Sequence, residues 1–313
     1  MWYWIALAAP FVLWVVLHMK TSRPDGKIIK VHPYRRIMWY IMPTRNESVV
    51  YFDSYVIADE VLRYVEDLNK VIPCTLNDVL VAAVARGLIQ TPEMDRFVAG
   101  HRLYQRYEPS ITFSMKRERK NKKSKISTVK QVIRPDHTIL TMIEDIRSKV
   151  KVERSDKKTT ADTEFQVLNL MPRPMFRGAF SLVRLLDYFN LLPGFFIKTD
   201  PMHTSIFMAN LGSINMAAGY HHLYEYGTCP LFIMIGKIED RPMVVDGEVV
   251  VKPVIHVRFS FDERIDDGMT AGNGIYEFTG ALENPYEILG CVGEDDAYEY
   301  GTERPRHWKR TDE

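Results

Sequence analysis

A short acidic segment near the C-terminal end holds residues that could carry chemistry. Asp262, Glu263, Asp266 and Asp267 lie within six consecutive positions. A glutamate can act as a general base when burial raises its pKa towards neutrality, and the nearby charges of Asp262 and Asp266 would raise the pKa of Glu263 further. Glu263 is equally open to a structural role, as a carboxylate paired with Arg264 or another basic side chain. The segment therefore predicts either a proton-transfer site or a structural ion pair.

A second candidate base is the pair His221-His222, in the polar and aromatic segment 219–227. Adjacent histidines on a strand would face opposite sides, so we expect no metal site here without outside ligands. The pair is open to two interpretations, hydrogen-bonded structural histidines or a catalytic base. The three cysteines have no CxxC spacing. They predict buried thiols in a reducing compartment rather than a disulfide framework or a zinc site.

Asp262, Arg264, Asp267 and Gly268 stand at the spacing of a known motif. The dihydrolipoyl acyltransferases of 2-oxo acid dehydrogenase complexes end their catalytic domain on Asp-His-Arg-x-x-Asp-Gly, and chloramphenicol acetyltransferase has the shorter His-x-x-x-Asp-Gly. Further segments are similar to that family and follow in its order, over roughly residues 33 to 287: 33–42, 75–85, 208–212, 233–251 and 283–285. The chain thus resembles a divergent member of this superfamily.

The resemblance implies a mechanism whose two principal side chains are missing here. In the family a histidine deprotonates the thiol of CoA or lipoamide, or an alcohol, and a serine binds the oxyanion. Glu263 and Ala209 stand at those positions, and Asp267 with Gly268 is expected to support the turn. Removing one oxyanion donor costs about 2.7–4 kcal/mol in other acyl-transfer sites. Neither Ser205 nor Ser213 is an obvious replacement, because side chains alternate along a strand.

The periodicity of the chain predicts strands alternating with helices around one large sheet. The fold class that we expect is α/β (α+β), a chloramphenicol-acetyltransferase-like mixed sheet with flanking helices and one N-terminal transmembrane helix. Thr75 is expected to cap a helix that has Asp78 in its first turn. The other expected helices cover 58–69, 138–152 and 270–282. The expected strands cover 49–56, two within 101–115, and 203–211, 230–239 and 249–261.

The N-terminal segment has the composition of a membrane helix. Residues 2–17 carry no charge, and the positive charges follow the apolar run instead of preceding it as in a signal peptide. The sequence therefore predicts an uncleaved transmembrane anchor over 1–20, with a cleaved or buried segment as the alternative. A basic linker over 21–32 would place the domain 33–291 in the cytoplasm by the positive-inside rule. A polar tail is expected over 292–313.

Two segments have no counterpart in the family that the chain resembles. Residues 116–125 are strongly basic, and they are interpreted as a solvated loop, as a contact with anionic lipid or as a contact with CoA phosphates; the basic residues are Lys116, Arg117, Arg119, Lys120, Lys122, Lys123 and Lys125. Residues 165–197 look inserted. They are interpreted as surface or subunit packing, as a helix lying on the bilayer or as a lid over an acyl-chain pocket.

These features together predict a membrane-anchored homotrimer with a degenerate catalytic site. It would act as a structural or assembly subunit, with other membrane-associated subunits as further partners. The alternative is an active acyltransferase that moves an acyl group from acyl-CoA or an acyl-carrier protein to a membrane-associated acceptor, with Glu263, His221 or His222 as base. Nothing in the sequence resembles a lipoyl domain. The net charge of +1 gives no reason to expect nucleic acid binding.

Overall fold

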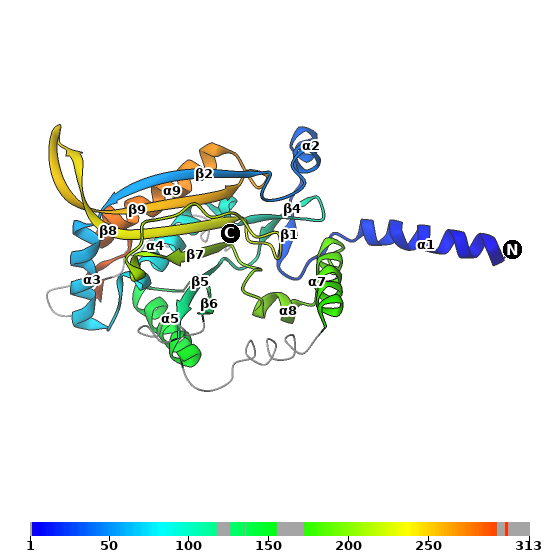
Figure 1. Cartoon of the computed structure of the whole chain (residues 1–313), viewed down its shortest axis with the longest axis horizontal. Helices are drawn as coiled ribbons and strands as arrows, with labels where there is room; N and C mark the ends of the chain where they lie inside the picture. The colour runs from blue at the N-terminus through cyan, green and yellow to red at the C-terminus, as the bar shows by residue number, and fades with distance from the viewer. Residues whose placement is uncertain (1, 118–125, 135, 155–171, 293–297, 300–313) are drawn as a thin grey trace.

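The computed structural model describes residues 2–117, 126–134, 136–154, 172–292 and 298–299. Its centre is a six-stranded mixed sheet (Figure 1). Strand β7 (Ile206–Asn210) runs parallel to both neighbours, and the other pairs are antiparallel. In sheet order the strands are β2 (Val49–Ile57), β9 (Glu248–Asp262), β8 (Leu231–Val245), β7, β5 (Ser110–Lys116) and β6 (Ile126–Val132). The predicted mixed sheet with flanking helices is confirmed.

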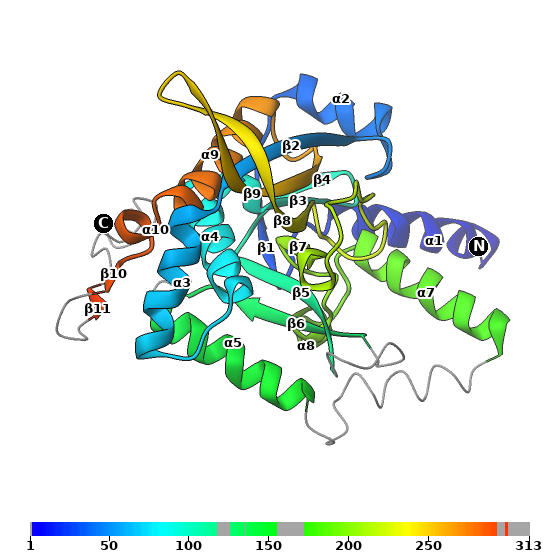
Figure 2. The same cartoon turned by 60° about the vertical axis from the view of Figure 1, so that its left-hand side comes forward.

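Helices gather on one side of the sheet, where the main core lies (Figure 2). They are α3 (Asp59–Val71), α4 (Leu76–Gln90), α5 (Ile139–Arg154), α9 (Gly268–Glu283) and the short α10 (Pro285–Ile288). Most of α4 is buried, because its apolar residues cover all its faces. The predicted cap is confirmed, since the Asp78 carboxylate accepts from the backbone N–H of Thr75 at 2.7 Å and from its hydroxyl at 2.8 Å.

A smaller, three-stranded sheet includes part of the segment 21–32. Its order is β1 (Gly26–Ile28), β4 (Arg102–Arg106) and β3 (Arg96–Ala99), and 3₁₀ turns lie at Pro92–Asp95 and Gly212–Ile214. The segment expected as a basic linker thus contains strand β1. Arg23, in the same segment, is buried, and neighbouring carboxylates pair with its charge.

The remaining elements lie at the ends of the chain and in the predicted insertion. They are α1 (Trp2–Met19), α2 (Pro33–Ile41), α7 (Arg173–Tyr188), α8 (Gly194–Thr199) and the pair β10 (Cys291–Val292) and β11 (Tyr298–Glu299). The rest of the predicted tail, 293–297 and 300–313, lies outside the described residues. Among the residues whose side chains are described, no single helix is long and apolar enough to cross a membrane. Only α3 and α4, counted together across a sharp bend, pass the same test of length and composition.

A buried cluster of charged side chains connects the C-terminal end of α7 with the residues before β1. Arg23 donates to Asp187 at 2.8 Å and to the side chain of Asn190 at 3.1 Å. His203 lies between two carboxylates, 3.8 Å from Asp187 and 3.6 Å from Asp200. Burial alone would lower the pKa of His203, but the two carboxylates outweigh it and raise that pKa. Burial alone would raise the pKa of the Asp187 carboxyl. His203 and Arg23 nevertheless hold that pKa at about 2.

The His203 cluster predicts a pH-dependent contribution to stability. A raised folded pKa stabilises the fold below the unfolded value of about 6.5, and the effect is lost as pH rises through the folded pKa. The variant His203→Gln should therefore cost about 3–5 kcal/mol at mildly acidic pH and distinctly less at alkaline pH. Urea unfolding at both pH values measures this, with His222→Gln as the control. A cost that does not change with pH would contradict it.

Candidate functional site

A large cavity opens where β7 ends between β5 and β8. Its volume is ≈1310 Å³, and it is walled by the N-terminal end of α4, one side of α5, the ends of β5 and β7, and the middle of β8. Apolar side chains supply most of the wall, among them Phe113, Ile146, Leu211 and Ile235. A cavity of this size and character is typical of a binding site for a small molecule or cofactor.

The polar lining of the cavity is mainly cationic. The cations among the described lining residues are Lys116, Arg147, Lys151, Arg154 and Lys237, and the one carboxylate is Asp78, which the Thr75 cap engages. The described lining includes no histidine, cysteine or glutamate. The cavity thus combines apolar walls with positive charge, and this combination suits a ligand that has an anionic end and an apolar end.

Ala209 lies in the wall of this cavity, at the C-terminal end of β7. Its methyl group has no proton to donate to an oxyanion. Ser205 is buried, and its hydroxyl oxygen accepts from the backbone N–H of Ser110 at 2.9 Å. Ser213 does line the cavity, but its hydroxyl donates to the backbone oxygen of Asn210 at 2.8 Å. Neither serine takes the place of the missing donor.

The wall beside Ala209 depends on two glycines. A Cβ atom on Gly212 would lie 2.5 Å from the backbone oxygen of Gly236, and one on Gly236 would lie 2.7 Å from the backbone nitrogen of Ala218. Side chains at either position would force the strands and the 3₁₀ turn apart. The glycines of the Ala-Asn-Leu-Gly segment and of β8 thus set the shape of the cavity.

Glu263 lies far from Ala209 within one chain. The strand register aligns Ala209 with Met234 on β8 and with Arg258 on β9, and Glu263 follows Arg258 by five residues. With a rise of about 3.4 Å per residue and a strand spacing of about 4.8 Å, the two positions are about 20 Å apart. Glu263 is exposed and does not line the cavity. One chain therefore cannot bring both positions onto the same reacting carbonyl group.

The predicted pairing of Glu263 with Arg264 is wrong. Arg264 is buried and donates to the neighbouring Asp262 instead, at 2.9 Å from Nε and 2.8 Å from Nη2. Asp262 also accepts from the hydroxyl of Ser48 at 2.8 Å and lies 4.0 Å from Arg45. Within the described part of the chain, no side chain lies within hydrogen-bond or ion-pair distance of the Glu263 carboxylate. The reason is geometric, because Asp262 is the inward residue and Glu263 is the outward one.

Asp267 has the structural role that the resemblance implies. Its carboxylate accepts from the backbone N–H of Thr270 at 3.0 Å and caps helix α9. This hydrogen bond holds the pKa of Asp267 below its ordinary value, and it makes the carboxylate a weaker base. Asp266 is engaged as well, in ion pairs with Arg35 at 3.3 Å and with Arg96. The acidic segment therefore supplies one exposed free carboxylate, that of Glu263, among the described residues.

The histidine pair does not lie on a strand, so the alternation of side chains along a strand does not apply to it. Both residues lie in the irregular segment before β8, and their rings stack at 4.8 Å. His221 also stacks on Phe232 at 3.9 Å, and its Nδ1 lies 2.7 Å from the backbone oxygen of His222. Burial lowers the pKa of His221. Neither histidine lines the cavity, and these contacts fit the interpretation of structural histidines.

Part of the basic segment is described. Lys116 lines the cavity, and Arg117 pairs with Glu153 at 3.5 Å. Arg119, Lys120, Lys122, Lys123 and Lys125 lie outside the described residues. The cations of α5 were not predicted from the sequence. Arg147, Lys151 and Arg154 recur at helical spacing beside the buried face of α5, and this pattern could have identified them.

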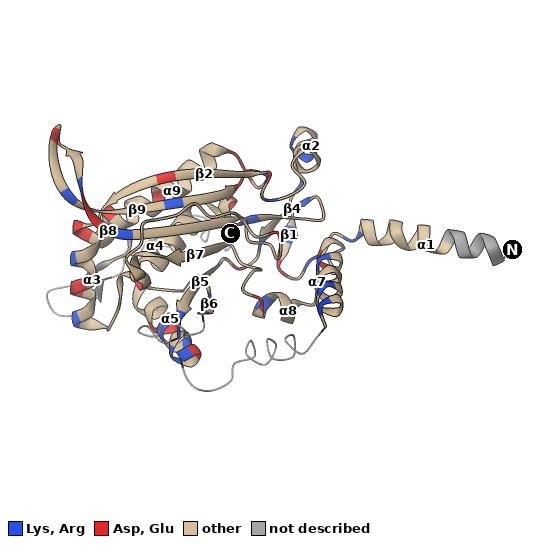
Figure 3. Cartoon of the chain, viewed as in Figure 1, with Lys and Arg blue, Asp and Glu red and all other residues tan. Residues whose placement is uncertain are grey.

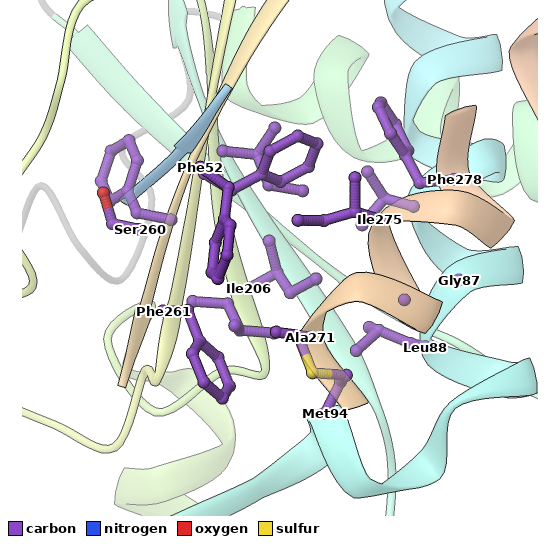
Figure 4. A pocket seen from close by; sticks show the side chains of 16 residues that line it. Phe52, Gly87, Leu88, Met94, Ile206, Ser260, Phe261, Ala271, Ile275 and Phe278 are labelled. Atoms are coloured by element: carbon purple, nitrogen blue, oxygen red, sulfur yellow. The ribbon is translucent and has the colours of Figure 1, made fainter. Parts of the chain in front are cut away.

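A second, much smaller cavity of ≈40 Å³ lies inside the core between the sheet, α4 and α9 (Figure 4). Phe52, Phe261, Ile275 and Phe278 are among its lining side chains. Ser260 brings a hydroxyl to its edge, but this group donates to the backbone oxygen of His221. Because its surface is almost wholly apolar, this space is a packing gap and offers a polar ligand no partners.

The sheet topology and the cavity define a domain with the acyltransferase fold, and comparisons with solved structures agree. A dihydrolipoamide acetyltransferase from Listeria monocytogenes has a TM-score of 0.56 at 14% identity, over 88% of this chain and 98% of that one. The cubic core of a pyruvate dehydrogenase multienzyme complex has a TM-score of 0.55 at 14% identity, over 83% and 94%. At this level of identity the likeness concerns the fold alone.

Residues 198–290 match the family model of the 2-oxoacid dehydrogenases acyltransferase (catalytic domain). This part of the chain is similar to that family. A lipoamide acyltransferase component of the branched-chain alpha-keto acid dehydrogenase complex from Pseudomonas aeruginosa is 43% identical over 55 residues, which are 18% of this chain. A dihydrolipoyllysine-residue succinyltransferase from Cupriavidus necator is 41% identical over 51 residues, or 16%. The matched stretches span only 12–13% of the length of these relatives.

The Asp262 cluster predicts very different costs for two adjacent substitutions. Asp262→Asn would leave Arg264 and Arg45 buried without their carboxylate, and it should destabilise the fold by about 3–5 kcal/mol. Glu263→Gln changes an exposed side chain and should stay within about 0.5 kcal/mol of the wild type. Urea unfolding of both variants measures the difference. Equal changes in the free energy of unfolding would mean that the Asp262 cluster does not stabilise the turn before α9.

Proposed function

We propose that this protein is a membrane-anchored trimer with the acyltransferase fold in which acyl transfer has been lost and binding of an acyl carrier is retained. It would serve as a binding or assembly subunit. The observation that carries the proposal is the cavity at Ala209. It is large and cationic, yet alanine stands where the family has its oxyanion-binding serine, and the described lining has no histidine or glutamate to move a proton.

The chemistry of the cavity favours a CoA thioester as the ligand. The apolar wall would accept an acyl chain and the pantetheine arm, whereas Arg147, Lys151 and Arg154 would pair with phosphates. The N-terminal end of α4, with Asn77, also faces the cavity and favours negative charge there. A phosphopantetheine arm on a carrier protein offers the same groups with fewer phosphates.

The separation of Ala209 from Glu263 supports a trimer. In the family that the chain resembles, the two catalytic side chains come from neighbouring subunits, and a separation of about 20 Å within one chain agrees with that arrangement. The related structure named above is the cubic core of a multienzyme complex. We do not extend cubic assembly to this protein, because anchors on every subunit would have to meet one bilayer.

The first 20 residues support the membrane anchor. Helix α1 is apolar and projects away from the domain (Figure 1), and it is followed by Lys20 and other basic residues. By the positive-inside rule this charge pattern would keep the domain on the cytoplasmic side. Three anchors on one trimer would strengthen attachment without any new contact, which suits an assembly subunit that collects other membrane-associated proteins.

Acyl-CoA binding tests the proposal directly. Titration of the full chain with CoA and with short- and long-chain acyl-CoA should give saturable binding. The double variant Lys151→Gln, Arg154→Gln should weaken it roughly 10- to 100-fold, because each charge-assisted hydrogen bond contributes about 1.5–3 kcal/mol and rim contacts contribute less. The double variant Arg63→Gln, Lys70→Gln on α3 removes the same charge elsewhere and should bind normally. Absence of binding by a folded trimer would contradict the proposal.

The exposed carboxylate of Glu263 favours a second candidate function, an active acyltransferase. Because it has no partner among the described residues, Glu263 of one subunit is free to act at the cavity of the next. It would accept the proton of a thiol or alcohol as that group attacks the thioester carbonyl and the CoA thiolate leaves. The acceptor would be a membrane-associated molecule.

Replacing Ala209 and Glu263 by the serine and histidine of the family would distinguish these two functions. If the chemistry has been lost, the wild type should show no acyl exchange between acyl-CoA and a thiol, and Ala209→Ser with Glu263→His should gain it. The serine alone is worth about 10²–10³ in kcat at comparable sites, so the double variant should exceed either single one. Exchange by the wild type that Glu263→Gln abolishes would instead establish the second function.

A further inference from the structure

Helix α7 leaves an apolar flank uncovered. Its inner side packs on the domain through Ala179, Phe180, Val183 and Leu186, which recur at helical spacing and are only half-buried. Met175, Leu182 and Leu185 lie beside that inner side and are 59%, 54% and 54% exposed. Positions 175, 182 and 185 are seven and three residues apart, which places them along one line of the helix. This flank of α7 therefore forms an exposed apolar stripe.

The charges of α7 are almost all positive. Figure 3 shows mainly basic positions along α7. Arg173, Arg177 and Arg184 are exposed and, by their spacing, lie on the flank across from the apolar stripe. The single acidic residue, Asp187, is turned inwards to Arg23. The outward surface of α7 thus presents apolar and cationic groups without a carboxylate. A basic amphipathic helix of this kind is typical of proteins that lie on an anionic membrane surface.

Helix α8 extends the same surface. Phe195 is 75% exposed and Lys198 is also exposed. Both helices lie at the end of the domain from which α1 projects (Figure 1). An exposed phenylalanine beside lysine again combines an apolar group with a positive charge.

Contacts join the base of α1 to the C-terminal end of α7. The His18 ring packs against the edges of Tyr188 at 6.2 Å and Phe189 at 5.0 Å. Asn190 donates to the backbone oxygen of Lys20 at 2.8 Å. In Figures 1 and 2 α7 lies beside α1 at the same end of the domain. A bilayer that contains α1 would therefore have its surface close to the C-terminal end of α7.

We propose that α7 and the exposed side of α8 dock on the anionic surface of the bilayer that holds α1. The inference rests on the proposed membrane anchor and adds a second contact that fixes the orientation of the domain. Anionic phospholipid headgroups supply the charge that the arginines lack, and the apolar stripe would enter the interface. None of the described residues of 172–199 lines the cavity at Ala209, which counts against the lid interpretation of this segment.

Depth measurements on the reconstituted full chain test this inference. Single cysteines would replace Leu182 on α7, Leu13 on α1 and Val249 on the distant β8–β9 hairpin in a Cys291→Ser background, and each would carry an environment-sensitive dye. The vesicles contain phosphatidylcholine with phosphatidylglycerol, or phosphatidylcholine alone, and a nitroxide lipid as quencher. We expect quenching at positions 13 and 182 but not at 249. Quenching at 182 should be stronger with the anionic lipid.

The three positions separate the possible failures. If the nitroxide lipid quenches the dye at position 13 but quenches the dye at 182 no more than the dye at 249, docking is overturned and the anchor is not. A dye at 13 that stays in water would overturn the anchor itself. A dye at 182 that is shielded from a water-soluble quencher before reconstitution would show that a second copy of the chain covers α7, which also overturns the inference.

Charge removal gives a second test. Each arginine near an anionic surface contributes about 1 kcal/mol. Arg173→Gln with Arg177→Gln should therefore shift the ratio of docked to undocked α7 by roughly 30-fold, as read from the dye at position 182. Arg63→Gln with Lys70→Gln removes two charges from α3 at the opposite end of the domain and should leave the ratio unchanged. Equal responses to the two double variants would contradict docking through α7.

Discussion

The ion pair of Asp262 with Arg264 is the interaction on which the arrangement of the acidic segment depends. Both side chains are buried, and Arg264 also donates to the backbone oxygens of Met42 and Pro43. Trp39 of α2 donates in turn to the backbone oxygen of Arg264. The pair therefore connects the end of β9 with α2 and the loop that follows it. Because a buried charge without its partner is costly, the turn that precedes α9 has little freedom to change.

The same constraint explains why the motif is only partly retained. Asp262, Arg264 and Asp267 each have a structural partner in this chain, so the fold needs them whatever the protein does. Glu263 points outwards, and Ala209 lines an open cavity. Substitutions at these two positions change chemistry at little cost in stability. The stability of this fold therefore constrains Asp262, Arg264 and Asp267 much more than it constrains positions 209 and 263.

Local patterns were enough to predict much of the fold. Alternation and helical spacing located β2, α3, α5 and α9 to within a few residues, and the Thr75–Asp78 pair located the start of α4. The Ala-Asn-Leu-Gly segment also identified Ala209, which lines the cavity. Local patterns could not predict which charged side chains pair, because the partners of Arg23, Asp187 and Asn190, lie far along the chain. The role of Arg264 was missed for a related reason, since the sequence does not reveal which of two adjacent carboxylates faces inwards.

The cavity depends even more on long-range geometry. Its wall combines the cap of α4, the cations of α5, the ends of β5 and β7 and the middle of β8, and the backbones approach closely at Gly212 and Gly236. Each of these segments taken alone has the pattern of an ordinary surface or core element. They form one wall because β7 runs parallel to both of its neighbours, so that β5 and β7 end beside the same part of β8. The cavity thus follows from the sheet topology, and its shape does not depend on the side chain at position 209 or 263.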